Sequence, residues 1–331
     1  MTIYDIAKLA GVSASSVSRV INGKPGVNRE ARQRIELLLR QNHYTPDENA
    51  RSLVMQTSRT IGILTDDIAS SRQNEGTSKV EYEMMRNGYY CFVKYIGNDE
   101  NAIEDGFIDL ASRRVVGALL LGVSFRRNKE VEQAVRRHLP DTPVMLVNHY
   151  SETQLENVYC VGTNERKGFV RCVDMMVKKG RKNIALMVDA RRVSSELIRT
   201  TFEERIKSYP AMNGWVYMGV EPNTQGGAQA VEHILQEHPE VDALICAQDL
   251  IAIGAMNQLL DNGIEVPRQI AILGEDNSTF CEVCRPRLSS LDTMLSTVSI
   301  MAARTLLDVL EKRETSHQIT LDMEIVERGS T

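Results

Sequence analysis

The pair formed by Cys281 and Cys284 has the Cys-x-x-Cys spacing found in some metal and redox sites. A zinc site needs further ligands, and neither a second cysteine pair nor histidines lie nearby in the sequence. We therefore expect two structural thiols in preference to a redox pair. His149 is the best single candidate for a catalytic base, but the chain has no HExxH, no GxSxG and no glycine-rich phosphate loop. The sequence predicts no enzyme, no metal site and no cofactor.

Several polar residues directly follow short apolar runs. This position suits them to bind a small molecule rather than to catalyse a reaction. In open α/β sheets a ligand binds beyond the carboxyl ends of the strands. Polar side chains just after predicted strands are therefore candidates for contacts to an effector. The candidate effector-binding residues are Ser71, Arg72, Gln73, Asn148, Arg199, Gln248 and Asp276.

The apolar runs that must position these residues begin at residue 60. They are 61–64, 115–121, 144–147, 184–188, 216–219, 243–247 and 270–274. The runs are continuous and are separated by helix-length segments, which predicts parallel strands buried on both faces and covered by helices. Seven such units exceed one ordinary doubly wound domain. We therefore expect an α/β body of two lobes, with a cleft between them, over residues 60–331.

The first residues of the chain have the pattern of two short helices joined by a tight turn. Ile6, Leu9 and Ala10 place apolar side chains on one helical face, and Gly11 can end that helix in a left-handed conformation. Ser13 is a suitable N-cap for a second helix, whose apolar stripe includes Val17. This predicts a helix-turn-helix, the unit that places a recognition helix in the DNA major groove.

A third helix is expected after Asn28, which is a suitable N-cap, so that residues 1–45 form an all-α DNA-binding head. The segment 46–59 follows as a hinge and linker. Thr45 and Glu48 have the capping-box spacing, and Pro46 falls at the first helical position. A helix of about two turns is marginal in water, so we expect it to form only with DNA or a partner subunit.

Charge is divided unevenly along the 331 residues, whose formal net charge is −5. Residues 1–60 hold nine Lys or Arg and five Asp or Glu, a net of +4, and the remainder holds thirty against thirty-nine, a net of −9. A basic head on an acidic body fits a DNA-reading module joined to a sensor. No signal segment opens the chain and no apolar run approaches the ~20 residues of a membrane span, so we expect a cytoplasmic protein.

The chain resembles the LacI/GalR family of bacterial transcription regulators in its helix-turn-helix and in several later segments. These segments are 27–32 (VNREAR), 42–46 (NHYTP), 50–53 (ARSL), 241–249 (VDALICAQD), 262–267 (NGIEVP), 270–278 (IAILGEDNS) and 285–288 (RPRL). The resemblance implies a two-lobed periplasmic-binding-protein type I fold behind the head. It also implies an effector held between the lobes.

The same resemblance implies roles for individual residues of the head. Those that fall at base-reading positions of the recognition helix are Ala14, Ser15 and Arg19, and those at phosphate-contacting positions are Thr2, Tyr4, Ser13, Ser18 and Asn22. Leu53 matches the hinge leucine that wedges into the minor groove and unstacks a base step. The predicted DNA-binding set is completed by Asn28, Asn49 and Ala50.

In the body, the resemblance assigns an effector-binding arginine to Arg199 and an effector-binding aspartate to Asp276. In the family, an aromatic residue precedes that aspartate in the turn, and here the position is occupied by Glu275. This predicts a charged cleft with few aromatic walls. Pyranose sugars stack on aromatic rings, so we expect an acidic or phosphorylated effector in preference to a neutral hexose. Supporting cations would be Arg72, Arg191 and Arg192.

We therefore expect a homodimeric regulator that binds a pseudo-palindromic operator in double-stranded DNA, with repression as the favoured mode and a small-molecule effector in control. The alternatives are a regulator whose atypical cleft responds to a protein partner, a solute sensor without DNA activity, and an enzyme. No leucine heptad closes the chain, so we expect no coiled-coil tetramer.

Overall fold

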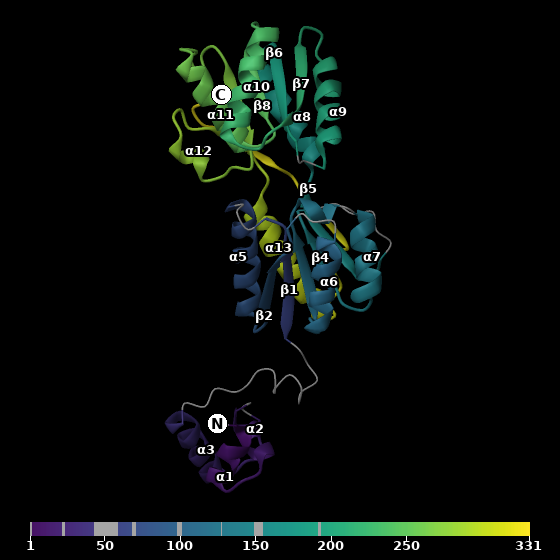
Figure 1. Cartoon of the computed structure of the whole chain (residues 1–331), viewed down its shortest axis with the longest axis vertical. Coiled ribbons are helices and arrows are strands. Elements are labelled where there is room, and N and C mark those ends of the chain that lie inside the picture. Colours follow the sequence, from purple (N-terminus) through teal and green to yellow (C-terminus); the bar gives the residue numbers. More distant parts are fainter. Residues whose placement is uncertain are drawn as a thin grey trace. The chain divides into compact units, whose positions relative to one another are not determined.

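The computed structural model describes residues 2–21, 24–42, 59–67, 71–97, 101–126, 128–148, 155–190 and 193–331. The chain divides into two compact units, Met1–Arg59 and Thr60–Thr331 (Figure 1). The expected head–hinge boundary at residues 45 and 46 and most of the expected hinge, residues 46–58, lie outside the described residues.

The described part of the first unit contains three helices, α1 (Ile3–Ala10), α2 (Ala14–Ile21) and α3 (Arg29–Gln41). The caps predicted for these three helices are confirmed, whereas the predicted capping box of Thr45 and Glu48 lies outside the described residues. Gly11 ends α1 with a left-handed φ of 66°, the Ser13 hydroxyl accepts the Ser16 N–H at 3.2 Å, and the Asn28 side chain accepts the Ala31 N–H at 2.8 Å. These contacts satisfy backbone groups that a short helix leaves without partners. They fix the turn between α1 and α2 and the start of α3.

The three helices enclose one small apolar core, formed by Ile6, Ala7, Ala10, Val17, Val20 and Ile35. Ile6, Val17 and Ile35 have no exposed surface. The apolar stripes predicted from helical spacing therefore face one another, with one exception. Leu9, predicted to lie on the apolar face of the first helix, is 56% exposed, and Ala7 takes its place in the core. The polar residues of α2 are left on the outside of the unit.

The second unit consists of two lobes. In the first lobe the strand order is β11-β5-β4-β3-β1-β2, and every neighbouring pair is parallel. Helices α5 and α13 pack on one face and α6 and α7 on the other, so both faces of the sheet are buried. The elements are β1 (Thr60–Thr65), α5 (Ser71–Arg86), β2 (Tyr90–Tyr95), α6 (Ala102–Ser112), β3 (Gly117–Leu121), a 3-10 turn η1 (Val123–Arg126), α7 (Asn128–His138), β4 (Val144–Val147), β5 (Val158–Thr163), α13 (Leu295–Leu310) and β11 (Gln318–Leu321).

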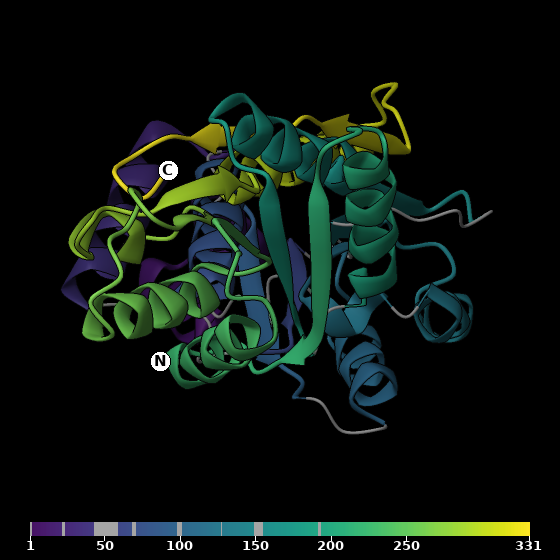
Figure 2. The same ribbon diagram turned by 90° about the horizontal axis from the view of Figure 1, so that it is seen from above.

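The second lobe repeats this architecture with the strand order β12-β10-β9-β8-β6-β7, in which only β12 is antiparallel to its neighbour. Helices α8 and α9 cover one face, and α10 and α11 cover the other (Figure 2). The elements are α8 (Glu165–Lys178), β6 (Asn183–Asp189), α9 (Ser195–Lys207), β7 (Asn213–Val220), α10 (Thr224–Glu237), β8 (Ala243–Cys246), α11 (Asp249–Asp261), β9 (Ala271–Glu275), α12 (Phe280–Val283), β10 (Ser289–Asp292) and β12 (Glu324–Val326).

The chain passes between the lobes three times, from β5 to α8, from β10 to α13 and from β11 to β12. The first and third crossovers are joined, because the Asn164 N–H donates to the Leu321 carbonyl at 2.9 Å. Lys167 also pairs with Asp322 beside them. These contacts hold the first and third crossovers side by side between the lobes.

The predicted two-lobed α/β architecture with parallel sheets is confirmed, and each of the seven apolar runs overlaps a strand. The sequence analysis missed β2, β5, β10, β11 and β12. Within the residues that the structure describes, no helix is long and apolar enough to cross a membrane.

Candidate functional site

The exposed face of the head carries the polar residues predicted to contact DNA. On α2, Ser15 and Arg19 are exposed. Val17, which lies between them in the sequence, and Val20, which follows Arg19, are buried. Tyr4 on α1 is 73% exposed. The helix therefore presents hydrogen-bonding groups outward over a fixed apolar base, which is the geometry that a recognition helix requires.

Gly26 allows the Arg19 side chain to fold over the loop before α3. A Cβ atom at position 26 would lie 2.7 Å from Nη1 of Arg19, and Gly26 has a φ of 102°. A larger residue here would meet both a strained backbone and the guanidinium. Gly26 was missed by the sequence analysis, which took this segment only as a connection.

Besides Ser13, which caps α2, two further predicted DNA-contact residues stabilise the helices of the head. Thr2 forms a capping box with Asp5, in which the Thr2 N–H donates to the Asp5 carboxylate at 2.7 Å. Asn28 caps α3. A capping side chain keeps its helix start in place whether or not DNA is bound. The predicted contacts that lie outside the described residues are Asn22, Asn49, Ala50 and Leu53.

A cleft of about 1100 Å³ lies between the lobes and is lined by loops that follow the strands of both sheets. The structure brings five of the predicted effector residues to it: Arg72, Gln73, Asn148, Gln248 and Asp276. Ser71 opens α5, but its side chain lies outside the described part of the chain. The rule that ligands lie beyond the carboxyl ends of parallel strands thus identifies most of this lining.

Two arginines of the first lobe form ion pairs with carboxylates of the second lobe. Nε of Arg72 lies 3.1 Å from Oδ1 of Asp276, and its Nη2 donates to the Thr293 hydroxyl at 2.9 Å. Nη1 of Arg126 lies 3.0 Å from Oε1 of Glu165, and these side chains are only 17% and 11% exposed. Both pairs bridge the cleft, so they hold the lobes at their present separation. Arg126 was not predicted.

Arg199 does not line the cleft. It lies on α9, where its guanidinium is held by Glu196 at 2.9 Å and by Glu203 at 2.7 Å. These two carboxylates raise the pKa of Arg199 further above its ordinary value. The arginine predicted for the effector is therefore part of an exposed helical ion-pair network. The cations of the described cleft lining are Arg72, Lys79 and Arg126.

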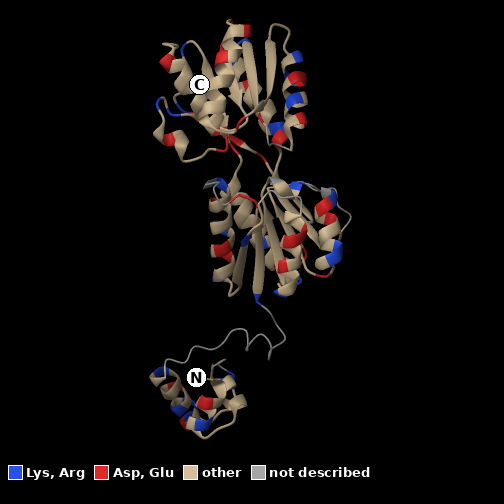
Figure 3. Cartoon of the chain, viewed as in Figure 1, with Lys and Arg blue, Asp and Glu red and all other residues tan. Residues whose placement is uncertain are grey.

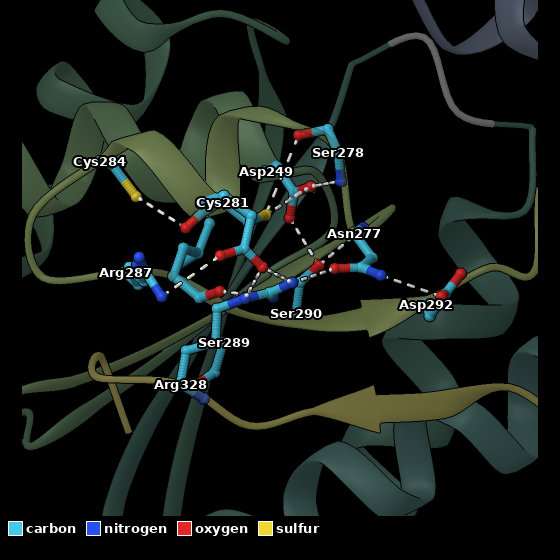
Figure 4. Close-up of polar contacts among 12 residues, drawn as sticks. Asp249, Asn277, Ser278, Cys281, Cys284, Arg287, Ser289, Ser290, Asp292 and Arg328 are labelled. Atoms are coloured by element: carbon cyan, nitrogen blue, oxygen red, sulfur yellow. Dashed lines mark hydrogen bonds and ion pairs between the residues drawn. The ribbon is translucent and has the colours of Figure 1, made fainter.

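A buried hydrogen-bond network shapes the turn that carries Asp276 (Figure 4). The Asp249 carboxylate accepts from the Ser290 hydroxyl at 2.6 Å, from the Ser278 N–H at 2.7 Å and from the Cys281 thiol at 3.1 Å. Burial raises the pKa of Asp249 despite these three donors. Burial also raises the pKa of the Cys281 thiol well above its usual range, so the thiol keeps its proton and donates it. The Cys-x-x-Cys segment thus supports the cleft as a structural element, and all six cysteines are free.

The same turn is tied to the second crossover. Asp276 and Asn277 have positive φ angles of 111° and 51°. The Asn277 amide donates to Asp292 at 3.0 Å, and Asp292 in turn accepts the Met294 N–H at 2.7 Å in the second crossover. Hydrogen bonds therefore connect the turn beside the cleft with the segment between the lobes.

Comparison with known proteins identifies both units. The profile of the bacterial regulatory proteins of the lacI family matches residues 2–47, and that of the periplasmic binding protein-like domain matches residues 173–331. Both units are therefore similar to those of helix-turn-helix transcription regulators of the lacI family.

Relatives of similar length show the same similarity over the whole chain. An HTH-type transcriptional regulator of Lachnoclostridium phytofermentans is 27% identical over 333 residues, which cover 100% of this chain and 99% of the relative. The regulator GalR of Escherichia coli is 26% identical over 94% of this chain and 90% of its own length. Both are described as regulators and not as enzymes.

Solved structures show the same fold. The lac repressor dimer bound to operator and the anti-inducer ONPF matches with a TM-score of 0.90 at 20% identity, over 100% of this chain and 98% of that chain. The regulator CelR in complex with cellobiose matches with a TM-score of 0.72 at 22% identity, over the whole of both chains.

The interlobe cleft is rich in carboxylates. Its described lining contains nine of them: Asp66, Asp67, Glu75, Glu165, Asp189, Asp249, Glu275, Asp276 and Asp292. The cations of the described lining are Arg72, Lys79 and Arg126, and its single aromatic ring is that of Phe280. Acidic segments accordingly lie at the facing ends of the two lobes (Figure 3). This lining has the few aromatic walls that were expected. Of the expected supporting cations, Arg72 lies in the lining, and Arg191 and Arg192 lie outside the described residues. Across the part of the chain that the structure describes, no cluster of three or more His, Cys, Asp or Glu could hold a metal ion.

Proposed function

We propose that this protein binds a pseudo-palindromic operator as a homodimer and represses transcription under the control of a small molecule in the interlobe cleft. The observation that carries the proposal is the exposed polar face of α2 on a basic, independently packed head. In this proposal Arg19, Ser15 and Ala14 face base edges. The phosphate contacts come from Thr2, Tyr4, Ser13, Ser18 and Asn22, and the hinge contacts from Asn49, Ala50 and Leu53.

A second copy of the chain would cover an exposed apolar surface on the first lobe. Helix α5 and the neighbouring edge strand β2 carry large apolar side chains that are 42–62% exposed: Tyr82, Met85, Tyr90, Val93 and Tyr95. Phe280 and Val283 on α12 of the second lobe are also exposed, at 44% and 71%. Apolar surface of this extent marks an interaction site. A dimer would also place two heads on the two halves of an operator.

The effector acts in this proposal by changing how far the lobes close. A molecule between them binds one lobe arrangement more tightly than the other, and this difference shifts the equilibrium between the two. The three crossovers and the interlobe ion pairs Arg72–Asp276 and Arg126–Glu165 are the parts that respond. When the lobes change their arrangement, the distance between the two heads of the dimer changes. The affinity of the dimer for the operator then changes as well. In this proposal the protein acts in the cytoplasm, because it must reach the chromosome.

The test is selection of bound duplexes from a random DNA pool by the full-length protein. We expect enrichment of a pseudo-palindrome with a flexible central step. The Arg19→Ala variant should lose about 1–3 kcal/mol of discrimination at one symmetric base position. The Arg34→Ala variant removes the same charge from an exposed position of α3 and should leave the sequence preference unchanged. A pool without any enriched sequence, or an unchanged preference in the Arg19→Ala variant, would overturn the proposal.

A further inference from the structure

Two arginines of the first lobe reach across the cleft to the second lobe. Arg72 pairs with Asp276 at 3.1 Å. Arg126 pairs with Glu165 at 3.0 Å, and its Nη1 also donates to the Ser194 hydroxyl at 3.3 Å. All these groups belong to the chain itself. The two lobes are therefore held together by their own side chains.

The pair formed by Arg126 and Glu165 is the more buried of the two. Its side chains are 17% and 11% exposed, against 34% and 14% for Arg72 and Asp276. Water screens charges poorly at such a place, so the sign of each charge matters. If one of the two charges were reversed, like charges would face each other across the cleft and drive the lobes apart.

One buried carboxylate holds both segments that carry these arginines. Asp66 directly follows β1 and is 1% exposed. Its Oδ2 accepts the N–H of Ser124 at 2.7 Å, in the turn η1 that ends at Arg126. Its Oδ1 accepts from Nε2 of Gln73 at 2.6 Å, and Gln73 follows Arg72 in α5. Each oxygen of Asp66 thus fixes one arginine-bearing segment.

The surroundings of Asp66 are shaped for this contact. A Cβ atom at position 122 would lie 2.1 Å from Oδ1 of Asp66, and Gly122 has a φ of 135°, so glycine leaves the space that the carboxylate fills. The Oε1 atom of Gln73 accepts the Asp67 N–H at 3.1 Å, which holds the Gln73 amide from its other side. These residues all lie in the first lobe. The network can therefore hold the arginines in place however far the lobes close.

We infer that Asp66 is the positioning residue of an interlobe lock, in which Arg72 and Arg126 hold the second lobe against the first without a ligand. This inference rests on the proposed function, in which operator affinity depends on the arrangement of the lobes. Because one carboxylate holds both arginine-bearing segments, the two ion pairs form and break together. An effector regulates operator binding by releasing this lock.

The experiment measures the distance between the lobes in the full-length protein by double electron–electron resonance. Spin labels are attached through an unnatural amino acid at Gln133 on α7 of the first lobe and Lys207 on α9 of the second, both of which are exposed. Labelled protein is diluted with unlabelled protein, so that the measured pairs lie within one subunit. No effector and no DNA are added.

Charge reversals test the lock. Arg126→Glu and Glu165→Arg should each shift the distances to longer values, and the variant that carries both changes restores opposite charges and should shift them back towards the wild type. Glu204→Arg reverses a charge in an exposed ion pair within the second lobe and should change nothing. Wild-type distances in both single variants, or no recovery in the double variant, would overturn the inference.

Asp66→Asn tests the positioning role. Both partners of Asp66 are donors, so the amide group of asparagine must turn a donor towards one of them. This variant should lengthen the interlobe distance although both arginines are present, and adding Gln73→Glu, which supplies an acceptor, should reverse the effect. Asp141→Asn at an exposed position of the first lobe is the control. If Asp66→Asn lowers the melting temperature but keeps the wild-type distance, Asp66 has only a structural role and the inference is wrong.

Operator affinity tests the regulatory part. The single charge reversals should change the affinity for the selected operator about tenfold or more, and the double variant should return it towards the wild-type value. Unchanged affinity in both single variants would contradict control by the lock. The distance measurement uses no DNA, so a failure of the lock is distinguishable from a failure of the proposed regulator, which operator selection tests.

Discussion

Replacing Asp249 with alanine should destabilise the second lobe, because this carboxylate is the common acceptor for three buried donors. They are the Ser278 N–H at 2.7 Å, the Ser290 hydroxyl at 2.6 Å and the Cys281 thiol at 3.1 Å. Asp249 itself is 2% exposed. The Asp249→Ala variant leaves these donors facing an apolar gap that lies beside the cleft (Figure 4).

The magnitude follows from two opposing contributions. Each buried donor that loses its acceptor costs about 1–3 kcal/mol. Removing a buried charge returns part of that cost, because burial already disfavours the ionised carboxylate, as its raised pKa shows. We therefore expect a net loss of about 3 kcal/mol in the free energy of unfolding. For a lobe of this size the melting temperature should fall by about 6–12 °C.

The Asp249→Asn variant adds a dependence on pH. The pKa of Asp249 is raised above its ordinary value of 3.8, so the folded state favours the protonated form. Its contribution to stability is full below pH 3.8 and is lost as the pH rises through the folded-state pKa. Asparagine does not titrate. The stability of the wild type relative to this variant should therefore fall as the pH rises from about 4.

Differential scanning calorimetry across this pH range measures both effects. Asp261→Ala, an exposed position on the same helix, is the matched control and should change the free energy of unfolding by less than about 0.5 kcal/mol. A melting temperature for Asp249→Ala close to that of the control would refute the role assigned to the network. A constant difference between wild type and Asp249→Asn would refute the raised pKa.

Three further predictions concern the head, the lobes and the dimer. Ile35→Ala removes a fully buried side chain from the small core of the head and should cost about 2–5 kcal/mol, enough to abolish operator binding in a mobility-shift assay without changing the melting temperature of the body. Arg126→Ala breaks the interlobe pair with Glu165 and should enlarge the radius of gyration in X-ray scattering. Arg166→Ala breaks only an exposed pair and should not. Met85→Asp should convert the proposed dimer to monomers in sedimentation velocity.

The strands that the sequence analysis missed do not all lack an apolar pattern. β2 and β5 contain the continuous apolar runs 89–93 and 158–161, which the sequence analysis did not use. β10 reads Ser-Ser-Leu-Asp and is buried nonetheless, because its serines have specific partners. The Ser290 hydroxyl donates to Asp249, and the Ser289 hydroxyl lies 2.7 Å from that of Thr331. Apolar periodicity predicts burial by the hydrophobic effect, but burial compensated by hydrogen bonds between distant segments has no local pattern.

The interlobe cleft shows a similar limit of local sequence patterns. Arg199 was predicted to line the cleft but does not, and Arg126 lines it without having been predicted. Arg199 is preceded at i−3 by Glu196 and followed at i+4 by Glu203, which is the spacing of an exposed helical ion-pair network, and this local pattern was available in the sequence. Arg126 follows the apolar run that became β3, so the rule used for the other strand ends would have included it. Its partner was not foreseeable in this way. Glu165 opens α8 in the other lobe, and the pair forms only because the first crossover returns the chain to the mouth of the cleft. Local sequence could therefore identify candidate residues on each side of the cleft. It could not identify the ion pairs across the cleft, because these depend on how far the lobes close. In the proposed function, an effector controls this degree of closure.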